Sequence, residues 1–374
     1  MRGLTAAAAL LICGVQLARA EPPVRPPPLP SEQARRLLDE AILASSGSGR
    51  TGTARDLVPR FKLAAEAAPH SVPALLDHAI VLDRAGDLEQ AEAVYLAAAA
   101  APDFPELRSA AAERAASIAL DRGDAAAVRA AVGLAHATLP DDAAPFVLEA
   151  RIALASHDAS AAHAAARSAL ARDPQDVEAL CALARAHLAQ GSPDVARLFA
   201  ARGARIDPED AEPLVIQAEI ARANGDPAAE LAAARAAVEA DVESATAALA
   251  LGRSLYERGQ VDEALRQLSR AAELDPLAAA IRLALGTVLG AQGQKAAAEE
   301  QLLAAAKRAP AWPEPHMELA RLKELQGDAK TALAEAKVFL RLSVRAPPPG
   351  HPIHALVQRC EESLRTRTQA SVVQ

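Results

Sequence analysis

Apolar residues recur at spacings of three and four along most of the chain, and residues 243–276 show this pattern most clearly. Each half of this stretch places small or apolar residues on one helical face, first Leu249, Leu251, Gly252 and Leu255, then Ala264, Leu265, Leu268 and Ala271. Residues 258–260 separate the halves, and Pro276 follows the second half, where a helix cannot continue. The pattern predicts two amphipathic helices, A and B, joined by a tight turn.

The same pattern returns along the chain every 34 residues. The glycines of the turns keep this period at Gly191, Gly225, Gly259, Gly293 and Gly327. Closing prolines and helix B alanines stay in the same register, at Pro140, Pro174, Pro208, Pro276 and Pro310 and at Ala162, Ala196, Ala264, Ala298 and Ala332. Because one hairpin cannot bury its apolar face alone, the repetition predicts a stack of hairpins in which each contacts its neighbours.

A helix–turn–helix unit of this length with small residues at these positions resembles a tetratricopeptide repeat. The resemblance is carried by a glycine in helix A, a turn glycine, two helix B alanines and a final proline: Gly252, Gly259, Ala264, Ala271 and Pro276. Ala248 stands where the family usually has a tryptophan. The resemblance implies an all-α fold, an α-solenoid of helix–turn–helix tetratricopeptide repeats forming a right-handed superhelix, closed by a C-terminal capping helix.

The repeat pattern also predicts how the chain is organised. A degenerate N-terminal helical hairpin is expected at residues 31–71, and eight tetratricopeptide repeats at residues 72–346. A capping helix with a polar outer side is expected at residues 347–367, followed by a disordered tail at residues 368–374. An insertion at residues 103–106 interrupts the register, and His157 stands in place of one turn glycine.

Residues 1–20 have the order of a secretory signal peptide. Arg2 precedes an apolar run that is too short to span a membrane, and Ala18, Arg19 and Ala20 form an Ala-x-Ala cleavage site. We therefore expect a protein that is exported and cleaved after Ala20.

Cys13 leaves open the alternative of a lipoprotein signal, although Ile12 stands where such signals have a small residue. The proline-rich residues 21–30 predict an extended linker. No later stretch is long and apolar enough to span a membrane. The expected location is periplasmic or extracellular, without a transmembrane segment.

Charge and composition narrow the range of functions. The formal net charge is −8, and removal of residues 1–20 takes away Arg2 and Arg19 and no acid, which makes it −10. An acidic chain with 2% aromatic residues does not fit nucleic-acid binding, which needs a basic surface and often stacking aromatic rings. Cys181 and Cys360 lie far apart in the repeat pattern and are expected to be small buried hydrophobes.

No motif predicts catalysis, a cofactor or a metal. Residues 45–53 contain the spacing Gly-x-Gly-x-x-Gly, but helical patterns flank it, whereas a dinucleotide site needs a preceding strand. His351 and His354 are one helical turn apart, yet no Cys, Asp or Glu stands at ligand spacing beside them. We therefore expect a protein that is not an enzyme and has no cofactor.

The resemblance also implies a binding surface, because helices A of the family line a concave groove that holds extended peptides or helices. Carried over by position, the fifth residues of helices A form an apolar row of Val147, Cys181, Val215, Leu249, Leu283 and Met317. The ninth residues form a row rich in arginine, with Arg151, Arg185, Glu219, Arg253, Thr287 and Arg321. The Lys and Asn with which some chaperone-binding relatives hold a C-terminal carboxylate are absent from these two rows.

Two interpretations of the arginine row stay open. The arginines would hold an acidic or carboxylate-bearing polypeptide segment, because a guanidinium can bind a carboxylate through two hydrogen bonds. Alternatively, the row is a solvated face with local ion pairs, such as Arg253 with Glu257, or Arg321 with Glu318 or Glu324.

Two functions follow from these expectations. The first is a non-enzymatic exported scaffold that binds polypeptide segments in the concave groove, for example as an accessory of a cell-envelope assembly or secretion system. The second is a structural or self-associating spacer of the envelope without a peptide ligand; in the self-associating case it forms a homo-oligomer.

Overall fold

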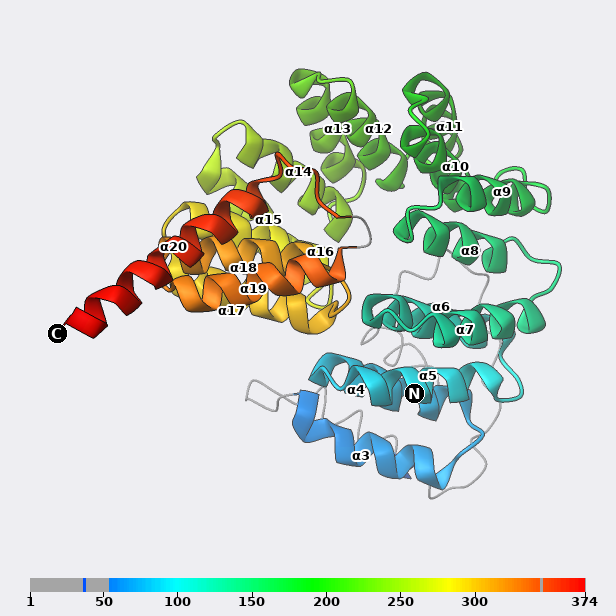
Figure 1. Cartoon of the computed structure of the whole chain (residues 1–374). Coiled ribbons are helices and arrows are strands. Elements are labelled where there is room, and N and C mark those ends of the chain that lie inside the picture. Colours follow the sequence, from blue (N-terminus) through cyan, green and yellow to red (C-terminus); the bar gives the residue numbers. More distant parts are fainter. Residues whose placement is uncertain (1–35, 38–53, 344–345, 374) are drawn as a thin grey trace. The chain divides into compact units, whose positions relative to one another are not determined.

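The structure is a computed structural model that describes residues 36–37, 54–343 and 346–373, with the side chains of residues 367–373 excepted. The predicted signal peptide, the linker, the glycine-rich loop and most of the first half of the N-terminal hairpin lie outside the described residues. Within the described residues the chain forms helices joined by short turns and contains no strand. The fold is an all-α repeat solenoid, as the sequence predicted (Figure 1).

Contacts divide the chain into two compact units, and each unit is described by itself. Unit 1 comprises Met1–Leu120 and Asp124–Ile206, and unit 2 comprises Asp121–Gly123 and Asp207–Gln374.

Unit 1 contains α3 (Ala54–Ala67), α4 (Val72–Ala85), α5 (Leu88–Ala100), α6 (Pro105–Arg122, apart from its last residues), α7 (Ala125–Thr138), α8 (Ala144–Ala155), α9 (Ala159–Leu170), α10 (Val177–Ala189) and α11 (Pro193–Ile206). Unit 2 contains α12 (Glu212–Ala223), α13 (Pro227–Ala240), α14 (Ala245–Glu257), α15 (Val261–Leu274), α16 (Ala279–Ala291), α17 (Lys295–Arg308), α18 (Glu314–Leu325), α19 (Ala329–Leu342) and α20 (Pro352–Val373).

The turns inside the hairpins require a left-handed residue. Between α14 and α15 this residue is Gly259, with φ of 75°, and its N–H donates to the carbonyl oxygen of Tyr256 at 2.9 Å. The N–H of Gln260 donates to Leu255 at 3.0 Å, so the carbonyl groups at the end of helix A are satisfied. His157 takes the same place between α8 and α9 with φ of 58°, a conformation that is strained for a residue with a Cβ.

Aspartate caps begin many of the second helices and explain where these helices start. The Asp158 carboxylate accepts a hydrogen bond from the N–H of Ala161 at 2.9 Å, and Asp226 accepts one from Ala229 at the same distance. Each carboxylate satisfies a backbone donor that the first turn of a helix leaves open.

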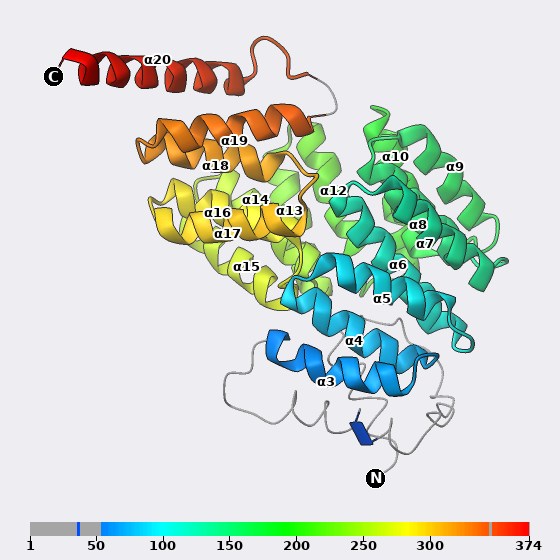
Figure 2. The ribbon, with the colours of Figure 1, turned by 60° about the horizontal axis from the view of Figure 1, so that its bottom comes forward.

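Unit 1 has a series of small cores rather than a single one. The largest cluster joins α4 to α7 with Leu148 of α8, and smaller clusters lie between α8, α9 and α10. Alanines fill many of these positions, and this lets adjacent helices such as α3, α4 and α5 run close together (Figure 2). Each hairpin therefore depends on its neighbours, as expected for a repeat stack.

The start of α6 differs from the expectation. The helix begins at Pro105, inside the insertion of residues 103–106 that was expected to precede the second repeat. Asp103 and Phe104 adopt left-handed φ values of 68° and 53°, which turn the chain, and proline is well suited to the first turn of a helix.

Unit 2 depends on close approach of helices at two glycines. A Cβ on Gly252 of α14 would lie 2.7 Å from Cγ of Leu268 and 3.3 Å from the carbonyl oxygen of Ala264, both on α15. Gly286 of α16 has the same relation to Leu302 of α17, at 2.8 Å. The small residue that the sequence placed in helix A thus stands where helices A and B touch.

The last helix closes unit 2 by packing beside α19 (Figure 2). Ile353, Leu356 and Cys360 of α20 are buried in one cluster with Phe339 of α19. Cys181, in unit 1, is buried at 3% exposure, so both cysteines that the structure describes are buried thiols, as expected.

The end of α20 also differs from the expectation. The helix continues to Val373, whereas a disordered tail was expected from residue 368. Neither proline nor glycine follows Pro352, so nothing in the sequence ends the helix earlier. None of the described helices is long and apolar enough to cross a membrane.

Candidate functional site

The ninth positions of helices A in unit 1 are Arg151 on α8 and Arg185 on α10. These two helices contact one another, so equal positions of adjacent repeats lie on neighbouring helices. Arg151 Nη1 donates a hydrogen bond to Oε1 of Glu113 on α6, and both side chains are about half exposed. Arg185 is half-buried. Arg151 therefore finds an acid on another helix, although its own helix offers none within one turn.

In unit 2, Arg321 on α18 forms a local ion pair. Its Nη1 lies 3.1 Å from Oε1 of Glu318, one turn earlier on the same helix, which is one of the pairs that the second interpretation named. Glu324, the other named acid, instead accepts two hydrogen bonds from Arg359 of α20, at 2.6 and 2.9 Å.

The remaining ninth positions of unit 2 are Glu219, Arg253 and Thr287, on the consecutively contacting helices α12, α14 and α16. Desolvation and then the charge of Arg222 lower the pKa of Arg253, while Glu257 and Glu219 act in the opposite direction. Arginine titrates so far above neutral pH that its guanidinium stays charged. Arg253 therefore remains an exposed cation in mixed surroundings.

The fifth positions of helices A are mostly packed inside the units. Val147, Val215 and Met317 are buried at 4%, 4% and 9% exposure, each in a cluster within its own unit. Leu249 and Leu283 are half-buried and also pack against their neighbours. Among the fifth positions that the structure describes, these two leucines keep the most apolar surface for an outside molecule.

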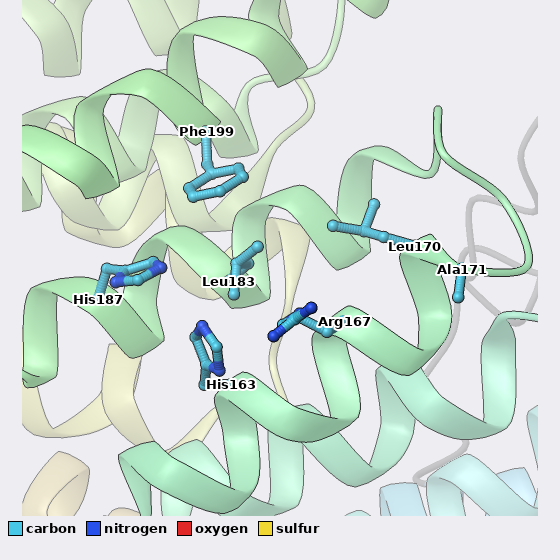
Figure 3. A pocket seen from close by; sticks show the side chains of 7 residues that line it. All are labelled: His163, Arg167, Leu170, Ala171, Leu183, His187 and Phe199. Carbon is cyan, nitrogen blue, oxygen red and sulfur yellow. The ribbon is translucent and has the colours of Figure 1, made fainter.

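A hollow of about 380 Å³ opens in unit 1 (Figure 3). Three successive helices line it: His163, Arg167 and Leu170 of α9 with its C-cap Ala171, Leu183 and His187 of α10, and Phe199 of α11. The ring of His187 stacks on Phe199 with centroids 5.5 Å apart and planes 3° apart. His163 meets His187 edge to face at 5.0 Å.

The polar groups of this hollow have no partners. Among the described residues, neither the ring nitrogens of His163 and His187 nor the guanidinium of Arg167 makes a hydrogen bond or an ion pair. Desolvation lowers the pKa of His187, and the neighbouring His163 lowers it further. No motif in the sequence brings His163 and His187 together.

Unit 2 holds a second feature that the sequence pattern did not predict. Glu230 of α13 is buried at 3% exposure, at the register position where most other helices B carry alanine. Nε and Nη2 of Arg222 donate to its Oε1 at 2.9 and 2.5 Å, and Glu257 lies 3.8 Å from the same Nε. In the sequence, the replacement of the usual alanine by Glu230 was the signal that could have indicated this buried ion pair.

His351 and His354 contact backbone groups at the start of α20. His351 Nδ1 accepts a hydrogen bond from the N–H of Ile353 at 3.2 Å, and His354 Nε2 lies 3.2 Å from the carbonyl oxygen of Pro347. Where the structure describes the chain, no group of three His, Cys, Asp or Glu side chains could hold a metal ion.

Family comparisons identify the repeats. A model described as "TPR repeat" matches residues 252–293, and one described as "Tetratricopeptide repeat" matches residues 153–220. With the stacked hairpins, these matches show that the chain is a tetratricopeptide repeat protein, as its sequence pattern predicted. A comparison with curated protein sequences finds no match.

Several solved structures have a similar fold. The APC/C hetero-tetramer Cut9-Hcn1 matches with a TM-score of 0.53 and 15% identity, over 88% of this chain and 64% of that chain. This chain thus spans less than two thirds of that protein. Pseudomonas aeruginosa pilF matches with a TM-score of 0.44 and 17% identity over 58% of this chain and 96% of its own. PilW, described as a type IV pilus biogenesis factor, matches with a TM-score of 0.42 and 20% identity, over 52% of this chain and 90% of its own. These likenesses show the fold alone.

Proposed function

We propose that this protein is a non-enzymatic, exported scaffold that binds acidic polypeptide segments on its helices A. The tetratricopeptide fold supports a protein partner, and the signal-like order of residues 1–20 supports export. The observation that carries the binding proposal is the row of exposed arginines at equal positions of helices A, Arg151, Arg253 and Arg321, in a chain with net charge −8.

The ion pairs of these arginines do not prevent binding. The side chains of Arg151 and Arg321 are 52% and 58% exposed, and pairs at such exposed sites are typically worth about 0–1 kcal/mol. A carboxylate from a partner can therefore replace Glu113 or Glu318 at little net free-energy cost. Each new contact is equally weak, so affinity depends on several contacts made together and fades with salt.

The apolar part of the proposed surface is narrower than the whole fifth-position row. Leu249, one helical turn before Arg253, and Leu283 keep part of their apolar surface exposed, whereas Val147, Val215 and Met317 are buried within their units. The acidic remainder of the surface repels acidic segments and so favours their binding at the arginine row. The preferred partner segment is therefore acidic, with a few apolar side chains.

The spacer alternative has less support. A spacer that stacks through its C-terminal end needs an apolar outer face on α20. The exposed side of that helix instead carries polar pairs, Gln358 with Glu362 at 3.1 Å and Arg365 with Glu361 at 3.8 Å. A polar outer face is what a capping helix requires.

Fluorescence anisotropy with the chain from residue 21 onward tests the proposal. The probes are a labelled peptide of about 12 residues that alternates glutamate with apolar residues, and the same peptide with glutamine for glutamate. The acidic peptide is expected to bind more tightly, and its advantage is expected to vanish between about 50 and 500 mM salt.

Variants assign the effect to the row. The triple variant R151Q, R253Q and R321Q is expected to lose most of the preference, whereas R235Q with R266Q, exposed arginines of helices B, keeps it. Glu113→Gln removes the internal competitor of Arg151 and is expected to strengthen binding. Equal binding of both peptides, or a triple variant that behaves as the wild type, contradicts the proposal.

A further inference from the structure

Two histidines in unit 1 occupy repeat positions at which unit 2 has two apolar residues or an ion pair. His163 of α9 and His187 of α10 are 24 residues apart in the repeat register. The corresponding pairs of unit 2 are Leu231 with Leu255, Leu265 with Leu289, Glu299 with Lys323, and Leu333 with Val357. The first, second and fourth pairs contribute to apolar clusters, and the third is an ion pair of 2.6 Å. In unit 2 the two positions satisfy each other, whereas two imidazoles leave their nitrogens without partners.

The surroundings of the two histidines are those of a binding site rather than of a packed layer. Arg167, one helical turn after His163, brings an unpaired guanidinium to the same hollow (Figure 3). Phe199, Leu170 and Leu183 supply an apolar wall. No carboxylate lines the hollow, although acids outnumber bases 48 to 40 in the chain. The hollow thus combines a cation and two potential N–H donors with an apolar surface, a set of groups that suits an anion with an apolar part.

We propose that this hollow binds a carboxylate carried on an apolar or aromatic group. The guanidinium of Arg167 pairs with the carboxylate, the imidazoles of His163 and His187 donate hydrogen bonds to it, and the apolar wall contacts the rest of the ligand. The volume of about 380 Å³ falls in the ordinary range of small-molecule sites and suits one group of the size of a phenylalanine residue. The carboxylate belongs either to a free small acid or to the last residue of a polypeptide.

This site is separate from the arginine row on helices A. Its cation lies on α9, a helix B, and none of its lining residues occupies a fifth or ninth position of a helix A. The inference therefore does not rest on the proposed scaffold function.

An anion in the hollow reverses the electrostatic situation of the histidines. Without a bound anion, desolvation and the neighbouring His163 lower the pKa of His187. The remaining charged group of the lining is Arg167, and α11 contributes only Phe199, which does not titrate. A bound carboxylate favours the charged imidazole and raises the pKa of His187. Binding is thus coupled to proton uptake, and affinity is expected to increase as pH falls from about 7.5 to about 6.

Three variants separate this site from general effects. Arg167→Gln removes the cation, and Arg235→Gln removes the exposed arginine at the same register position of α13 as a matched control. The double variant H163L and H187L installs the leucines that unit 2 has at Leu231 and Leu255. Because leucines pack well at these positions of the repeat, the double variant is expected to keep or raise the melting temperature while it loses the site.

Isothermal titration calorimetry, with the ring proton resonances of His187 followed by NMR, gives the readout. The probes are phenylacetate, N-acetyl-L-phenylalanine, its amide and a short peptide that ends in phenylalanine. Both acids are expected to bind and to raise the pKa of His187, and the amide is expected to bind at least about tenfold more weakly. Arg167→Gln is expected to lose about tenfold in affinity for the acids, Arg235→Gln to lose none, and the leucine variant to bind neither acid.

The peptide arm identifies the source of the carboxylate. Tighter binding of the peptide than of phenylacetate assigns the site to a polypeptide terminus, and equal binding assigns it to a small acid. The inference is overturned by equal affinity for acid and amide, by an Arg167→Gln variant that binds normally, or by no binding of either acid at about 10 mM, a Kd equivalent to less than 3 kcal/mol. Histidine resonances that respond to Zn²⁺ and not to the acids would assign the hollow to a metal instead. Loss of acid binding in Arg167→Gln with unchanged binding of the acidic peptide to helices A distinguishes this site from the arginine row.

Discussion

Gly252→Ala tests the packing of the repeats most sharply, because two effects of opposite sign compete at one atom. Alanine is favoured over glycine inside a helix by about 0.8–1.0 kcal/mol. The new Cβ, however, would lie 2.7 Å from Cγ and 2.9 Å from Cδ2 of Leu268, and optimal separations between carbon atoms are about 3.5–4.0 Å. Leu268 is completely buried and cannot swing into solvent. Overpacking of this kind costs about 1–3 kcal/mol, so we expect a net loss of up to about 2 kcal/mol.

Gly290 provides a matched control in the same unit. A Cβ there would meet Ala298 and Leu322 only at 3.7 and 3.9 Å, which are ordinary contacts. Gly290→Ala is therefore expected to stabilise by about 0.5–1 kcal/mol through helix propensity alone. The two substitutions should differ by about 1–3 kcal/mol, and Gly286→Ala, which meets Leu302 at 2.8 Å, should resemble Gly252→Ala.

Native-state hydrogen exchange of α14, α15 and α16 is the suitable assay, since repeat arrays need not unfold in a single step. The opening free energy of these amides is expected to fall in Gly252→Ala and to rise near Gly290 in Gly290→Ala. In a Leu268→Ala background the steric conflict is removed, and Gly252→Ala should then stabilise. If Gly252→Ala stabilised the wild-type protein as much as Gly290→Ala does, the close approach of the helices would be refuted.

Four further outcomes are expected. Arg222→Ala leaves the buried Glu230 carboxylate without its partner and should destabilise by about 3–5 kcal/mol in urea unfolding, whereas Glu230→Ala restores the usual alanine and should cost at most about 1 kcal/mol; equal losses would contradict the reasoning. His157→Gly removes a left-handed strain of about 1–2 kcal/mol, while the greater freedom of glycine in the unfolded chain partly offsets this gain. The urea midpoint should therefore rise slightly, and a clear fall of the midpoint would contradict the strain at His157. The pKa of His187 is lowered in the folded state, so its contribution to stability is full above about pH 6.5 and is lost as pH falls; His187→Leu should flatten the decline in melting temperature between about pH 7 and 5.5, and an unchanged decline would exclude this origin. N-terminal sequencing of the exported protein should begin at Glu21, and an intact Met1 in the cytoplasm would rule out cleavage.

The fold could be predicted from the sequence because each hairpin of a repeat stack contacts only its neighbours. The helical spacing and the turn glycines are local signals, and the left-handed turn at Gly259 is where the sequence placed it. The exposure of the fifth positions was not accessible in this way. It depends on how far each helix is rotated toward the next one, and Val147 and Met317 turn out to be buried.

The special features of the molecule appear in the sequence as departures from its own period. Glu230 interrupts the alanine register, and His163 with His187 stands at two positions where unit 2 has apolar pairs or an ion pair. A departure marks a position but does not name its partner, since Arg222 reaches Glu230 from the preceding helix. The contact of Arg151 with α6 was out of reach as well, because the insertion at residues 103–106 shifts the register before it.

Reversal of charge on helices A tests the central claim most directly. The variant R151E, R253E and R321E is titrated, by fluorescence anisotropy, with the acidic peptide and with the same peptide carrying lysine for glutamate. If the arginine row holds an acidic segment, the wild type prefers the acidic peptide, the variant prefers the basic one, and circular dichroism shows the same helix content in both. A variant that still binds the acidic peptide with wild-type affinity would contradict the assignment.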